Sequence, residues 1–246
     1  MPSLVDEFKL QSNADAMSSR LPKRYAEHRL DGYDPKRDAT AAKALDAARR
    51  FAGGEGAGLV LVGNPGSGKT HLAAGVCNAI AAELDTMVAG RTATWQQAHA
   101  EWNDSMTAWL ASPRTSERPP EPWKPTAVES FLLPQWVNVP DALGSMRREF
   151  GSEPETADRM DWFGEWKGLV VLDDLGREKV SDWTGEVVYT LVNARYEAML
   201  RTVVTSNLSL AELAETSYWP VVSRLAEDGF LVELKAPDER LARRIR

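Results

Sequence analysis

The chain has 246 residues, of which 43% are hydrophobic and 26% are charged, close to the average of soluble globular proteins. This length accommodates one large domain, or one domain with a small appendage. Acidic residues outnumber basic residues by 36 to 29, which gives a formal net charge of −7. Such a balance argues against a protein that coats duplex DNA non-specifically, so any nucleic-acid contact must use a local basic patch.

The sequence has no apolar run near the ~20 residues that a membrane helix needs. Its first residues lack the basic and apolar regions of a secretory signal. We therefore expect a cytoplasmic protein without membrane contact. The single cysteine, Cys77, excludes an internal disulfide framework and falls within a predicted helix, where we expect a buried small side chain.

Residues 1–52 are polar and interrupted, and we expect a short N-terminal lead-in that packs on the core and is partly disordered at its tip. A helix is predicted over residues 39–51, because apolar side chains recur there at helical spacing and two glycines follow. Residues 53–246 are assigned to one larger domain, with an insertion at about 86–130.

The larger domain alternates short apolar runs with helical patterns. Strands are predicted at 59–62, 135–139, 169–173, 202–206 and 230–234. Helices are predicted at 69–84, 141–150, 184–199, 209–216 and 220–227. This alternation is typical of an α/β fold, a parallel sheet covered by helices on both faces, whose ligands bind at the carboxyl ends of the strands.

A glycine-rich loop joins the first of these strands to its helix. The run Gly63-Asn64-Pro65-Gly66-Ser67-Gly68-Lys69-Thr70 fits the pattern G-x-x-x-x-G-K-[ST] at every constrained position. In such a loop the backbone N–H groups and the new helix dipole hold phosphate. Lys69 is expected to contact the β- and γ-phosphates, and the Thr70 hydroxyl to complete a Mg²⁺ site. The sequence therefore predicts a nucleoside triphosphate site.

The stretch from 86 to 130 is longer than a usual connection. Trp95, Trp102 and Trp109 recur every seven residues, which gives one helical face an aromatic character. Prolines between 113 and 125 exclude a helix or a central strand there. The tryptophans of this inserted helix either pack on their own domain or form a surface for a partner or for stacked bases.

The strand at 169–173 is followed by a second acid, so that Asp173 and Asp174 stand together at its carboxyl end. In this architecture the strand tip lies beside the phosphate-binding loop. Asp173 is predicted to hold Mg²⁺ through its water shell, and Asp174 to polarise an attacking water.

Two further side chains are candidates for the same site. Asn207 follows the strand at 202–206 and has two interpretations. In the first it belongs to the site, where it orients the water or contacts the γ-phosphate. In the second it caps the next helix. Arg224 is either a solvated surface charge or a finger that stabilises transition-state charge in a neighbouring subunit.

In this order, the motifs resemble those of the AAA+ ATPases of the bacterial helicase-loader group. This family joins the DnaC- and DnaI-type loaders with the IstB-type transposition ATPases. The resemblance covers roughly residues 21 to 240. It rests on Gly63–Thr70 followed by His71-Leu72-Ala73, on 172–176, on Thr205-Ser206-Asn207, on Ser223-Arg224-Leu225, and on Leu21–Tyr25, Tyr33 and 139–143.

The resemblance implies an AAA+ P-loop core that binds ATP and Mg²⁺. It makes Lys69 and Thr70 part of Walker A with His71 adjoining it, Asp173 and Asp174 Walker B, Asn207 sensor 1 and Arg224 the arginine finger. It also implies a hexameric replicative helicase as partner, homo-oligomers on assembly, and weak contact with single-stranded DNA. The candidate DNA contacts are Arg147, Arg148, Arg159 and Lys167, which otherwise form a solvated face, and a C-terminal cluster of Arg240, Arg243, Arg244 and Arg246.

The sequence also departs from the family pattern. The N-terminal helicase-binding domain of DnaC-type loaders is expected to be missing or reduced to about twenty residues, and the tryptophan-bearing insertion is not part of the pattern. A helical lid is expected to be absent or much reduced, which leaves Arg240 as the candidate for a second sensor. Walker B reads Asp-Asp rather than Asp-Glu, as in this group.

The sequence therefore predicts an ATP-dependent loader that delivers a replicative helicase to single-stranded DNA, with slow hydrolysis outside the assembly. One alternative keeps the chemistry and changes the partner, as an IstB-type regulator of a transposase. Another is a nucleotide-gated adaptor with negligible turnover. A small-molecule kinase would need an acceptor pocket and a basic lid, and the sequence after Asp174 indicates neither.

Overall fold

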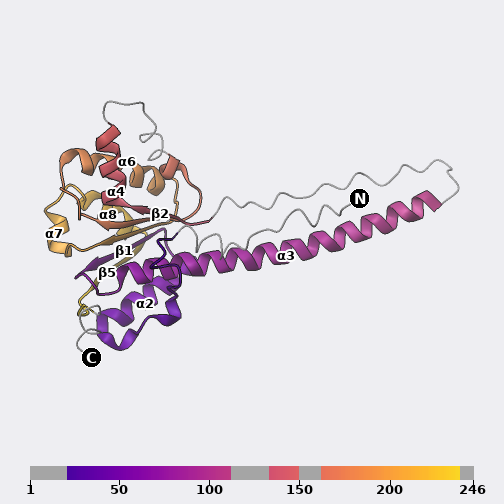
Figure 1. Ribbon diagram of the computed structural model, residues 1–246, viewed down its shortest axis with the longest axis horizontal. Helices are drawn as coiled ribbons and strands as arrows, with labels where there is room; N and C mark the ends of the chain where they lie inside the picture. Colours follow the sequence, from indigo (N-terminus) through magenta and orange to yellow (C-terminus); the bar gives the residue numbers. More distant parts are fainter. Residues whose placement is uncertain (1–20, 112–132, 150–161, 239–246) are drawn as a thin grey trace.

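The computed structural model describes residues 21–111, 133–149 and 162–238 (Figure 1). Within these ranges five strands form one sheet in the order β2-β3-β4-β1-β5, and every neighbouring pair is parallel. The strands are β1 (Gly58–Gly63), β2 (Gln135–Asn138), β3 (Val170–Leu175), β4 (Thr202–Ser206) and β5 (Gly229–Leu234). The predicted α/β fold with a parallel sheet is confirmed.

Helices cover both faces of the sheet (Figure 1). One face carries α2 (Ala39–Ala52) and the first part of α3 (Lys69–Ala111). The other carries α4 (Val139–Glu149), α6 (Asp182–Glu197), α7 (Leu210–Ala214) and α8 (Trp219–Glu227). None of the helices in the described ranges combines the length and apolar character that a membrane span requires.

Strand residues alternate between two hydrophobic cores. In β1, Leu59 and Leu61 belong to the core under α2 and α3, whereas Val60 and Val62 belong to the core under α4, α6 and α8. Because both faces of the sheet are buried, its strands are nearly continuous apolar runs.

The lead-in from residue 21 onward belongs to the first core. Leu21, Leu30 and Tyr33 are buried there, and the chain reaches α2 through two 3-10 turns, η1 (Leu30–Gly32) and η2 (Pro35–Arg37). This part packs on the core, as expected, and residues 1–20 lie outside the described ranges.

Helix α3 is far longer than the predicted helix at 69–84, because it continues without a break to Ala111. The expectation of a separate inserted helix is wrong, since the insertion begins as an extension of α3. The reason is local: residues 85–111 contain one glycine and no proline, and the first proline after them is Pro113. Figure 1 shows the extension projecting away from the sheet. In the first part of α3, Cys77 is fully buried, as predicted.

The tryptophan face of α3 is described in part. Trp102 is half-buried, and its ring stacks on His99 with centroids 6.1 Å apart. The side chains of Trp95 and Trp109, and the proline-rich stretch after residue 111, lie outside the described residues. Packing on the same domain and docking of a partner both stay predictions.

The pairing of β3 with β4 is irregular where the two acids lie. Leu172 pairs with Val204 and Leu175 pairs with Ser206, so three steps along β3 match two steps along β4. β3 therefore runs through the acid pair to Leu175 instead of ending at residue 173 as predicted. Such bulges re-aim side chains next to functional sites, and the apolar pattern of β3 does not reveal this one.

A buried arginine joins α6 to the entrances of β3 and β4. Arg195 is fully buried, and burial lowers its pKa to about 10, so it stays charged at neutral pH. Its guanidinium donates five hydrogen bonds of 2.6 to 2.9 Å, to the Thr202 hydroxyl and to the carbonyl oxygens of Phe163, Trp166, Gly168 and Arg201. These carbonyls precede the strands, so one side chain fixes where both strands begin.

We expect Arg195→Ala to lower the free energy of unfolding by at least about 3 kcal/mol, because several buried acceptors lose their donor at once. Arg49→Ala is the matched control, since Arg49 makes an exposed ion pair with Asp31 at 2.8 Å, and we expect a loss below about 1 kcal/mol. Urea unfolding followed by circular dichroism measures both. Equal losses in the two variants would contradict the structural role of Arg195.

Candidate nucleotide-binding site

The glycine-rich loop at 63–70, predicted to bind phosphate and called the phosphate loop below, lies between β1 and α3 at the carboxyl edge of the sheet. All three of its glycines have a positive φ, and at two of them a Cβ would meet a backbone atom or an aromatic ring. Gly63 has a φ of 122°, and a Cβ there would lie 2.1 Å from the Leu234 carbonyl oxygen. Gly68 has a φ of 105°, and a Cβ there would lie 2.5 Å from the Tyr33 ring. The loop can therefore keep this path only with glycine at these positions.

Lys69 is held inside the loop. It is 4% exposed, and its Nζ donates to the carbonyl oxygens of Gly63 at 2.7 Å and Asn64 at 2.8 Å. The ammonium group thus lies within the curve of the loop, where phosphate oxygens would bind.

The lead-in forms one wall of the loop, which the sequence pattern did not indicate. Tyr33 Oη donates to the Ser67 carbonyl at 3.2 Å. Arg37 donates to the carbonyls of Ser67 and Gly66 at 3.0 Å each, and to that of Pro237 at 2.8 Å. Arg37 therefore connects the phosphate loop to the segment that follows β5.

His71, predicted to adjoin the nucleotide, is directed toward the lead-in. Its Nε2 lies 3.0 Å from the Arg29 carbonyl oxygen, and its ring meets the His28 ring edge-on with centroids 4.3 Å apart. These contacts place His71 in the packing between α3 and the lead-in. A direct role in nucleotide binding stays a prediction.

The structure brings Thr70 and Asp173 together from positions 103 residues apart. Asp173 is 3% exposed, and its Oδ1 accepts hydrogen bonds from Thr205 Oγ1 at 2.6 Å and from Thr70 Oγ1 at 3.3 Å. Burial raises the pKa of Asp173 to about 6, with a smaller contribution from the charge of Asp174. A carboxylate facing a hydroxyl beside the phosphate loop is a donor set that fits Mg²⁺.

Asp174 has an unusual backbone and a well-held side chain. Its φ of 62° is in the left-handed region, which is rare for a residue with a Cβ. Its Oδ1 accepts from Asn207 Nδ2 at 3.0 Å, and its Oδ2 accepts from Arg177 at 3.2 Å. The N-cap of α7 is Ser209, so the alternative interpretation of Asn207 as the helix cap is wrong.

Arg224 lies away from the loop of its own chain. It occupies the last turn of α8, next to Leu225, whose carbonyl packs against Gly58 at the amino end of β1. The loop begins at the other end of β1, five residues or about 16 Å away. Arg224 is half-buried and donates to Tyr189 Oη at 2.7 Å, with its guanidinium over the Tyr189 ring.

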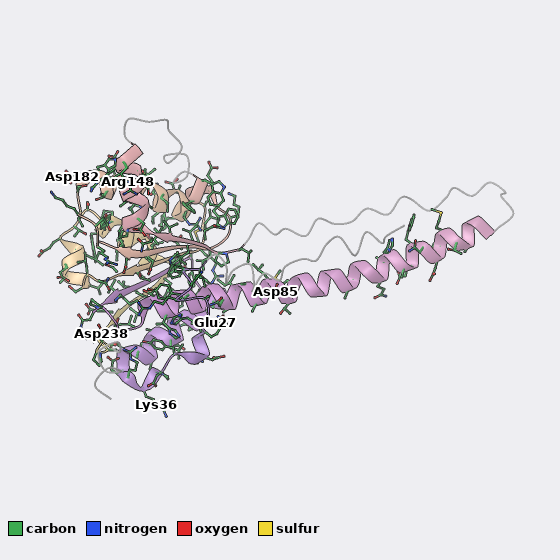
Figure 2. All side chains as sticks on the ribbon, viewed as in Figure 1. Glu27, Lys36, Asp85, Arg148, Asp182 and Asp238 are labelled. Atoms are coloured by element: carbon green, nitrogen blue, oxygen red, sulfur yellow. The ribbon has the colours of Figure 1, made fainter. Side chains whose placement is uncertain are left out.

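The candidate DNA contacts are partly described. Arg147 and Arg148 are exposed at the end of α4. This end lies next to the start of α6, where Arg147 is 3.5 Å from Ser181 Oγ and its guanidinium lies over the Trp183 ring. Figure 2 shows Arg148 and Asp182 at this end of the domain. Lys167 is also exposed. Residue 159 and the C-terminal arginines lie outside the described ranges.

In the absence of Mg²⁺, Asp173 opposes folding as the pH rises. Its pKa of about 6 lies above the ordinary aspartate pKa of 3.8, so its unfavourable contribution to the free energy of folding develops between these values and is complete above pH 6. We therefore measure the melting temperature of Asp173→Asn minus that of the wild type, both in EDTA. We expect this difference to increase from pH 4.5 to pH 7.5. A difference that stays constant across this range would contradict the burial argument.

No protein-family model and no curated protein sequence matches the chain. A crystal structure of the DnaC helicase loader is 25% identical, covers 87% of this chain and 100% of that chain, and has a TM-score of 0.58.

Two further solved structures match at lower identity. A crystal structure of DnaI is 20% identical, covers 91% of this chain and 99% of that chain, and has a TM-score of 0.59. The replication initiator DnaA bound to AMPPCP and single-stranded DNA is 15% identical, covers 91% of this chain and 56% of that chain, and has a TM-score of 0.55. At 20% and 15% identity, the DnaI and DnaA structures show the fold alone. The chain therefore has the AAA+ P-loop fold, and its predicted resemblance to the DnaC/DnaI loader group is confirmed.

Proposed function

We propose that this chain is a Mg²⁺-dependent ATPase whose nucleotide state controls its assembly with a replicative helicase on single-stranded DNA. The observation that carries the proposal is the 3.3 Å contact between Thr70 and Asp173, beside a buried Lys69. A structural turn would need neither a buried ammonium nor a buried carboxylate at its centre, because both are costly to desolvate.

The residues support phosphoryl transfer to water, in which positioning and charge neutralisation do most of the chemistry. Lys69 would neutralise charge on the transferred phosphoryl group. Mg²⁺, held by Thr70 and Asp173, would supply further neutralisation when bound. Asn207 fixes Asp174 Oδ1, so this carboxylate can orient the attacking water and accept a hydrogen bond from it.

A replicative helicase is proposed as the partner because the DnaC helicase loader, whose structure is 25% identical in sequence, resembles this chain. The DnaA structure, which contains AMPPCP and single-stranded DNA, supports nucleotide binding and DNA contact within this fold. Within the described ranges, the candidate DNA contacts are the exposed side chains of Arg147, Arg148 and Lys167. With a net charge of −7, that contact is expected to be weak and salt-sensitive.

We expect Mg²⁺-ATP to raise the melting temperature of the wild-type chain and to change its capture by the purified hexameric helicase of the same host. Lys69→Ala should lose both responses, because phosphate loses its ammonium partner. Lys43→Ala, at an exposed position on α2, is the matched control and should behave as wild type. A wild-type chain that binds no nucleotide would refute the ATPase, and nucleotide binding without helicase capture would refute the partner alone.

Arg224 lies beside the amino end of β1, whereas the loop begins at its carboxyl end, so we expect it to complete the site of a neighbouring copy. Arg224→Ala should keep nucleotide binding and lose partner-stimulated turnover by about 10³-fold or more. Mixing Arg224→Ala with Lys69→Ala should restore turnover, because the second variant supplies the arginine and the first supplies an intact loop. Mixing that restores nothing would contradict an intersubunit site, whatever the stability of either variant.

A further inference from the structure

Thr205 lies on β4, opposite Asp173 and Asp174 of β3, and is fully buried. Its hydroxyl makes hydrogen bonds with both of these acidic residues. Its Oγ1 donates to Asp173 Oδ1 at 2.6 Å and accepts from the Asp174 backbone N–H at 3.0 Å. The N–H can only donate, so the single hydroxyl hydrogen is directed to the carboxylate. One side chain on β4 thus fixes a carboxylate and a backbone position on β3.

The bulge between β3 and β4 explains why a hydroxyl is needed there. Three steps of β3 face two steps of β4, so the ladder of backbone hydrogen bonds is locally disrupted at the acids. The Thr205 hydroxyl gives the Asp174 N–H an acceptor at this point. The neighbours Val203 and Val204 are buried on the same strand without any hydroxyl, which shows that the strand itself does not require one.

The same Asp173 oxygen that accepts from Thr205 also faces Thr70. Asp173 Oδ1 lies 2.6 Å from Thr205 Oγ1 on one side and 3.3 Å from Thr70 Oγ1 on the other. The short bond to Thr205 therefore sets the orientation in which the carboxylate meets the phosphate loop. It also stabilises the charged form of a carboxylate that is almost completely buried.

We propose that Thr205 is a positioning residue for Mg²⁺, acting through Asp173, an inference that rests on the proposed function. In this role Thr205 would not bind the ion itself but would orient the carboxylate of Asp173, which would hold it. Partners that orient a metal ligand typically contribute ten- to a hundredfold to metal affinity. The competing interpretation is that Thr205 only packs and stabilises the strand.

The test separates the hydroxyl from the packing by comparing Thr205→Val, which keeps the shape, with Thr205→Ser, which keeps the hydroxyl. The Mg²⁺ concentration at half-maximal rise in melting temperature is measured in the presence of AMPPCP, and AMPPCP affinity is measured in EDTA. Thr205→Val should raise the half-maximal Mg²⁺ concentration about ten- to a hundredfold and leave the EDTA affinity unchanged. Thr205→Ser should restore the wild-type Mg²⁺ dependence.

Thr202→Val is the matched control, because Thr202 is an equally buried threonine of β4 whose hydroxyl binds Arg195 at 2.9 Å instead of an acid. It should lower the melting temperature without moving the Mg²⁺ dependence. Wild-type dependence in Thr205→Val, or the same loss in Thr205→Ser, overturns the inference and leaves the proposed function intact. Should Thr205→Val not fold, Thr205→Ala replaces it with the same two outcomes. A wild-type chain without any Mg²⁺-dependent change refutes the proposed function instead.

Discussion

The burial of one carboxylate, Asp173, is the constraint on which the organisation of this domain depends. An apolar residue there would cost far less, because burial raises the pKa of Asp173 to about 6 and so opposes its charged form. The site offsets this cost with hydroxyls from two other elements, Thr70 at the start of α3 and Thr205 on β4. The relative positions of β3, β4 and α3 must therefore be held closely.

Contacts at both ends of the strands hold β3, β4 and the phosphate loop in place. At the amino edge, Arg195 binds the segments that precede β3 and β4, so these strands begin in a fixed relation. At the carboxyl edge, Tyr33 and Arg37 bind the carbonyls of the phosphate loop from outside. The lead-in thus contacts the candidate nucleotide site, although the glycine-rich pattern begins thirty residues after Tyr33.

What the sequence predicted well is what local pattern controls. The loop at 63–70, the acid pair and the five strands follow from glycine spacing and apolar runs, which depend on neighbouring residues. The length of α3 was missed because its tryptophan repeat suggested a new element, although no residue between 85 and 111 stops a helix. The bulge at Asp173, and the contacts of Thr205 and Arg37, depend on register and on distant segments, which periodicity does not encode.

Two features of the chain, Arg224 and the extension of α3, are directed away from the candidate site. Arg224 is half-buried against Tyr189 at the amino edge of the sheet, so its guanidinium is preorganised where it cannot approach the phosphate loop of the same chain. The extension of α3 projects from the domain (Figure 1). Under the proposed function, a site whose acids and loop are complete but whose additional cation lies at the far edge would bind nucleotide alone. We then expect efficient hydrolysis only when a second copy brings its own Arg224 to the loop, because a single chain would lack that charge at the transferred phosphoryl group.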